Sequence, residues 1–158
     1  IFPPKAGKET VAKSREKIAV EIYFSDVNER FLQPEKRFIS KEKTIEGQAK
    51  EIVKALIDGS KTNLVNTFPV NTQVQSLKVD QNKTAMISFS RNLIQSHPGG
   101  SASEMATIYS LTNSLTINIP GIERVRILID EKDVSSLKGH IDTSSFFNMN
   151  KEIIAPGS

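Results

Sequence analysis

The spacing of apolar residues changes several times along this chain, and each change predicts a new secondary-structure element. From residue 17 apolar and polar residues alternate, which is the period of a half-buried strand. From residue 45 the period becomes that of an amphipathic helix, with apolar residues at Ile45, Ala49, Ile52, Val53, Leu56 and Ile57. Gly59 stands where a left-handed cap would end this helix. The region between, 31–40, contains Pro34 and predicts an extended edge segment.

The second half of the chain repeats this change of period. Alternating residues at 77–79 and 85–89 flank a polar loop, which predicts a hairpin. A second helix is predicted from Ser101 until Pro120 and Gly121 stop it. A strand at 125–129 and a turn at 130–133 follow, and the remainder predicts one more short strand with irregular packing.

The predicted order is strand, extended segment, helix, two strands, helix, strand. It is typical of the split βαβ arrangement and of the α+β class, with one mixed β-sheet that carries both helices on one face. A length of 158 residues with 37% hydrophobic content fits a single domain. We expect a basic flexible linker at 1–16, the domain at 17–150 and a C-terminal tail at 151–158.

The net charge of +3 is concentrated at the N-terminal end, because basic residues exceed acidic ones by three within residues 1–17. The basic residues there are Lys5, Lys8, Lys13, Arg15 and Lys17. The rest of the chain is neutral and lacks the basic face that binds phosphates, so we expect no nucleic-acid partner. We interpret the basic segment as a solvated tail; contact with anionic lipid headgroups is the alternative.

The chain contains no cysteine, which excludes disulfides, thiol catalysis and thiolate metal sites. It has no run of apolar residues long enough to predict a membrane span. The sequence starts at Ile1 rather than at methionine, so we expect a processed product or fragment that joins a membrane only through an anchor outside this chain.

Several segments together resemble the GerMN domain. In the first half they are VEIYF at 20–24, LQPEKR at 32–37 and LIDG at 56–59; in the second they are GGSASE at 99–104, NSLT at 113–116, PGIERVRILID at 120–130 and GHID at 139–142. The resemblance covers residues 17–146. It implies a domain of sporulation and germination proteins and of bacterial lipoproteins, similar in fold to the ring-building motif, and a family not known for catalysis. Ser60 and Glu131 depart from the family, which often has proline and glycine at these turns.

The pattern S-x-x-E at 101–104 predicts a capping box in which Ser101 is the N-cap of the second helix. Such a cap contributes about 1 kcal/mol. Gly99 and Gly100, which precede it, would suit an anion at a helix N-terminus. We favour the capping box, because it would already satisfy those donors and because Glu104 would repel an anion.

The sequence offers little for catalysis. His97 and His140 are the only histidines, and neither lies in a nucleophile motif. His140 with Asp142 could supply two metal ligands, but we favour a loop histidine beside an aspartate that forms a turn. The carboxylate pairs Glu29 with Glu35 and Glu42 with Glu46 are interpreted as solvated surface charges. We therefore predict no catalytic residues, no metal and no cofactor, and we assign no binding residues.

Three functions remain. We favour a noncatalytic, extracytoplasmic module, anchored to a membrane, that binds an envelope protein through a sheet edge or face. A module that binds peptidoglycan is the alternative, although the chain offers no tryptophan and only Tyr23 and Tyr109 as tyrosines. A wall hydrolase lacks an obvious nucleophile or metal site.

Deleting residues 1–16 should leave the melting temperature of the domain nearly unchanged, because this segment has charge, proline and glycine but no apolar periodicity. Thermal unfolding of the full and the shortened chain tests this. A large drop in melting temperature would show that the segment packs on the core.

Overall fold

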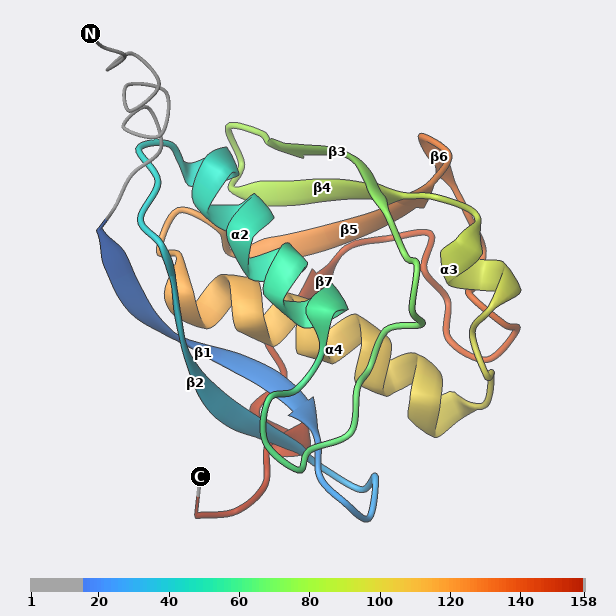
Figure 1. Ribbon diagram of the computed structural model, residues 1–158. Coiled ribbons are helices and arrows are strands. Elements are labelled where there is room, and N and C mark those ends of the chain that lie inside the picture. The colour runs from blue at the N-terminus through green and yellow to red at the C-terminus, as the bar shows by residue number, and fades with distance from the viewer. Residues whose placement is uncertain (1–15, 158) are drawn as a thin grey trace, which may run out of the picture.

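The computed structural model describes residues 16–157, so the predicted linker lies outside the described residues except for Glu16. Figure 1 shows the elements in chain order. The strands are β1 (Lys17–Ser25), β2 (Leu32–Ser40), β3 (Val74–Val79), β4 (Thr84–Phe89), β5 (Arg124–Ile129), β6 (Lys132–Asp133) and β7 (Phe147–Asn148). The helices are α2 (Ile45–Asp58), α3 (Asn92–Gln95), α4 (Ser101–Asn118) and the 3₁₀ turn η1 (Lys151–Ile153). None of the helices in the described part of the chain is both long and apolar enough to cross a bilayer.

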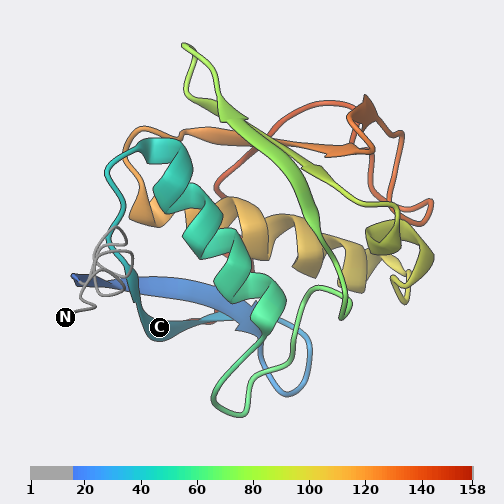
Figure 2. The same cartoon turned by 45° about the horizontal axis from the view of Figure 1, so that its top comes forward.

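The strands form two sheets with the long helices between them, as Figure 2 shows. The larger sheet has the order β3-β4-β5-β6, with β7 on β5, and it is mixed because β4 and β5 run parallel while the other pairs are antiparallel. Helices α2 and α4 cover one of its faces. The predicted α+β class is thus confirmed. Strands β1 and β2, which the prediction placed in the same sheet, form a separate antiparallel hairpin on the other side of the helices.

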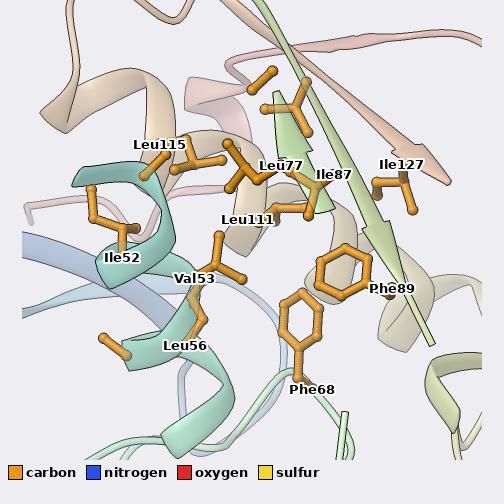
Figure 3. Close-up of a cluster of buried hydrophobic side chains, with 14 of the residues drawn as sticks. Ile52, Val53, Leu56, Phe68, Leu77, Ile87, Phe89, Leu111, Leu115 and Ile127 are labelled. Carbon is orange, nitrogen blue, oxygen red and sulfur yellow. The ribbon is translucent and has the colours of Figure 1, made fainter. Parts of the chain in front are cut away.

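The core lies where α2, α4 and the larger sheet meet (Figure 3). Its side chains are almost fully buried and include Ile52, Val53, Leu56, Leu77, Ile87, Phe89, Leu111, Leu115 and Ile127. Phe68, from the long connection after α2, adds its ring 5.6 Å from that of Phe89. Leu77, Ile87, Phe89 and Ile127 come from alternating strand positions, so the period-two patterns correctly predicted the buried face.

Both ends of α2 follow the sequence signals. Thr44 precedes the helix, and its hydroxyl oxygen accepts a hydrogen bond from the Gly47 N–H at 2.9 Å. Gly59 ends it at the predicted place and with a positive φ of 95°, but its ψ of 173° is extended rather than that of the predicted left-handed cap. A Cβ at Gly59 would lie only 2.6 Å from the Asn66 side chain, so the position also leaves no room for a larger residue.

The start of α4 differs from the prediction. Gly100 occupies the N-cap position, Ser101 is already helical, and no side chain caps the helix. The predicted capping box is therefore wrong. The reason lies in Glu104, which is fully buried and binds residues of a distant loop instead of reaching back to the helix start.

The turn between β5 and β6 places two non-glycine residues in the left-handed region. Asp130 has a φ of 50° and Glu131 a φ of 66°, and the pair Ile129 with Lys132 closes the hairpin around them. Two central residues with positive φ are the requirement of a type I′ turn, where glycine is preferred. Glu131 is one of the two positions at which the chain departs from the GerMN pattern.

Replacing Glu131 with glycine should increase the free energy of unfolding by about 1 kcal/mol, because glycine adopts positive φ without the steric cost of a Cβ. The matched control is Glu131→Ala, which removes the same carboxylate, including its 2.9 Å hydrogen bond from the Ser76 hydroxyl, but keeps the Cβ. Urea unfolding of both variants decides: equal stability of the glycine and alanine variants would contradict strain at this turn.

Candidate binding surface

Polar side chains of α4, buried except for Asn118, bind the backbone of several distant segments. The Ser114 hydroxyl oxygen accepts from the Tyr23 N–H at 2.9 Å, and Asn118 both accepts from and donates to the backbone of Glu21. These contacts occupy the edge of β1 that does not face β2. The Asn113 side chain pairs in the same two-bond manner with the backbone of Asn150. The edge of β1 is therefore closed by helix side chains at Glu21 and Tyr23 and by the backbone of Val65 at Ser25, rather than by another strand.

Glu104 joins the motifs at 99–104 and 139–142. Its carboxylate accepts backbone hydrogen bonds from Lys138, His140 and Ile141 at 3.2–3.3 Å and lies 2.6 Å from the Nδ1 atom of His140. Burial by itself would raise the pKa of Glu104, but the His140 and backbone hydrogen bonds outweigh it and hold the pKa below its usual range. Glu104 is a structural anchor for the loop after β6.

His97 uses both of its ring nitrogens inside the fold. Nδ1 accepts from the Gly99 N–H at 2.9 Å, and Nε2 lies 2.8 Å from the Thr107 hydroxyl, which itself donates to the Thr67 carbonyl. This pattern requires a neutral imidazole with its proton on Nε2. Burial, the largest influence, lowers the pKa of His97 and favours the same neutral form.

Asp142, His140 and Glu46 also form hydrogen bonds within the fold. Asp142 accepts from the backbone and hydroxyl of Ser144, so it forms a turn, while His140 binds Glu104. Within residues 16–157 no group of three or more histidine, aspartate or glutamate side chains could hold a metal ion. Glu46 is exposed, and its carboxylate accepts from the Val79 N–H at 2.9 Å.

Glu35 contradicts the prediction of a solvated charge. It is 5% exposed and accepts hydrogen bonds from Ser60, Lys61, Thr62 and Arg37. Although burial raises the pKa of Glu35, these donors lower it to about 2. Ser60 contributes its hydroxyl here and its N–H to Asn66, two groups that the proline common in the GerMN pattern could not supply. Glu29 lies apart, exposed at the turn between β1 and β2.

A groove of about 380 Å³ runs between α2 and β3; we call it the edge groove. Its lining comprises Lys50, Lys54, Ile57 and Asp58 from the helix and Thr72, Val74, Gln75 and Ser76 from the strand side. The helix and the strand run in opposite directions along it (Figure 2), since Glu46 at the start of α2 binds Val79 at the end of β3.

Strand β3 is the last strand of its sheet on this side, so one edge of its backbone is not paired with another strand. The Asp80 N–H donates to the Thr84 carbonyl, which makes this a hydrogen-bonded pair of the antiparallel ladder. Because such pairs alternate, Leu77 and Val79 direct their N–H and C=O groups away from β4. Glu46 takes the Val79 N–H, and the groups of Leu77 remain for another partner.

Two further hollows, of about 250 and 320 Å³, meet over the N-terminal half of α4 and share Ser25, Glu29, Ala102 and Ala106. Neither hollow is lined by residues of β3. The edge groove combines the unpaired backbone of β3 with the two lysines of α2, and we take it as the candidate binding site. Sequence analysis did not find it, because Lys50 and Lys54 have the spacing of any solvated helix face.

Comparison with known proteins finds a matching family and structures with the same fold. Residues 21–135 match the model of the Germane family, described as sporulation and spore germination. The structure is similar to that of a "Putative Lipoprotein from Clostridium perfringens", with 26% identity over 88% of this chain and 92% of that one and a TM-score of 0.63. No curated protein matches.

Two Bacillus subtilis structures share the fold. The tandem GerMN domains of the sporulation protein GerM match with a TM-score of 0.69 and 17% identity, over 87% of this chain and 47% of that one. The first GerMN domain of the same protein matches with a TM-score of 0.63 and 19% identity, over 85% of this chain and 98% of that one. This chain thus spans about half of the tandem protein.

Replacing Glu104 with glutamine should lower the free energy of unfolding at pH 7 by about 1–3 kcal/mol, because the amide oxygen can replace Oε1 for the three loop N–H groups, but the amide has no second acceptor for His140 Nδ1 and no charge. Since the folded pKa of Glu104 lies below its usual value, its charge stabilises the fold above the unfolded pKa, and this contribution is lost as the pH falls. Urea unfolding at pH 7 and pH 3 should show the difference shrinking in acid. Glu123→Gln, at an exposed ion pair, is the control.

Proposed function

The chain belongs to the Germane family of sporulation and spore germination domains, and on this premise we propose that it is a noncatalytic domain of the bacterial cell envelope that binds another protein. Residues 21–135, most of the domain, carry the family match. The GerMN resemblance in the sequence is thereby confirmed. The clostridial structure supports an envelope location, since a lipoprotein is held at a membrane by its lipid. We propose the same extracytoplasmic location, with an anchor, for this protein.

The edge groove is the observation that carries the binding role. A strand edge beside a helix offers backbone hydrogen bonds and side-chain pockets together, which is how sheets bind extended segments of other proteins. The fold leaves this edge without a strand while it closes the edge of β1 with Ser114 and Asn118.

The roles of the ionisable side chains support a noncatalytic domain. His97, Glu104 and Glu35 are buried, and their hydrogen bonds hold backbone and hydroxyl groups of the fold. A general base needs a free acceptor within reach of a substrate proton. These groups have the burial of catalytic residues but the contacts of structural ones.

Photo-crosslinking tests the proposal. A benzoylphenylalanine at Lys54, inside the edge groove, should crosslink a specific protein in envelope extracts, and the same residue at Lys132, exposed on β6, should not. The purified domain should release no product from peptidoglycan with or without divalent metals. Turnover that disappears on His140→Ala, or on metal removal, would refute the noncatalytic role, and sedimentation with purified peptidoglycan would favour the wall-binding alternative.

A further inference from the structure

We infer that the edge groove binds an acidic segment of the partner protein in extended conformation, as an additional strand on β3. This inference rests on the proposed function and specifies the chemistry of its partner. It follows from three properties of the groove: the unpaired backbone, the charge of the helix wall and the apolar side chains between them.

The backbone of β3 requires an extended partner. Leu77 directs its N–H and C=O groups out of the sheet, and Val74 does so on the other side of a β-bulge, since Ser90 pairs with Gln73 next to it. A strand laid along this edge satisfies these groups. A helix presents side chains but no free backbone groups, so it cannot replace the strand.

The helix wall selects negative charge. Lys50 and Lys54 are exposed and lie one helical turn apart on the groove side of α2. None of the ion pairs found among residues 16–157 includes either lysine. Glu46, bound to Val79, and Asp58 lie at the two ends of the same wall, so acidic side chains are favoured beside the two lysines and disfavoured at either end. This arrangement fixes the position of the bound segment along the groove.

The remaining lining explains how side chains of the partner alternate. Ile57 and Val74 are half-buried and form an apolar part of the groove between helix and strand. Successive residues of a strand point in opposite directions. Because α2 carries both Ile57 and the two lysines, every second side chain of the added strand points toward α2: carboxylates are favoured there beside Lys50 and Lys54, and a small apolar residue beside Ile57 and Val74.

The probe for this inference is a short capped peptide of alternating valine and glutamate, titrated into the ¹⁵N-labelled domain. Binding should shift the amide signals of Val74 and Leu77 and should weaken as salt is added. Two variant peptides separate the contribution of the carboxylates from that of backbone pairing. Replacing glutamate with lysine should abolish binding, and methylating alternate backbone nitrogens should weaken it about tenfold, because only strand pairing requires those N–H groups.

The protein variants test the lysines directly. Lys50→Glu with Lys54→Glu should weaken peptide binding by about tenfold or more. The matched control is Lys36→Glu with Lys132→Glu, which changes the net charge equally at exposed positions of β2 and β6 outside the groove lining. Equal affinity of the two double variants, or amide shifts confined to other parts of the domain, would overturn the inference.

This outcome can be separated from failure of the proposed function. In the Lys50→Glu, Lys54→Glu variant the benzoylphenylalanine must be moved to another position. If this variant then crosslinks the envelope partner as well as the wild-type domain with the same label does, the protein-binding role stands and the acidic strand is wrong. If the wild-type domain crosslinks no protein but binds the acidic peptide at Val74 and Leu77, the groove chemistry stands and the envelope role is wrong.

Discussion

The hydrogen bonds of the buried polar side chains of α4 determine where the rest of the chain can lie. The helix lies between two sheets, and Thr107, Ser110, Asn113 and Ser114 on it are at most 1% exposed. A buried polar group without a partner costs about 1–3 kcal/mol. In the described part of the chain every buried side-chain nitrogen and oxygen has one. Satisfying α4 therefore fixes the positions of β1, the loop around Thr67 and the segment at Asn150.

This constraint explains why the strands divide into two sheets. Elements in the predicted order would ordinarily join one sheet, and β1 has the alternating pattern of a sheet strand. However, Ser114 and Asn118 bind the backbone edge at which another strand would pair. Strand β1 keeps only β2 as a strand partner, and the hairpin packs on the helices from the side opposite the larger sheet.

The sequence predicted what depends on local periodicity and missed what depends on distant partners. Helix α2, the hairpin of β3 and β4, and strand β5 follow from spacing alone, whereas α4, which buries polar as well as apolar residues, is indicated mainly by its start and stop signals. The pattern S-x-x-E predicted a cap at Ser101, but the use of Glu104 is decided by backbone groups more than thirty residues further along the chain. Glu35, in a run of charged residues, gave no local sign that Ser60 and Thr62 would enclose it.

The candidate site is one of the features that depend on distant partners. Lys50 and Lys54 have an ordinary helical spacing, and they gain significance only because α2 lies along the open edge of β3. Placing them there requires the whole core, since Leu77 anchors the strand and Ile52, Val53 and Leu56 anchor the helix. The groove is thus held by elements that are rigid on both sides, and a partner that adds a strand there orders few groups of the domain itself. The entropy lost on binding then falls mainly on the partner segment, which favours binding that depends on the sequence of that segment rather than on rearrangement of the domain.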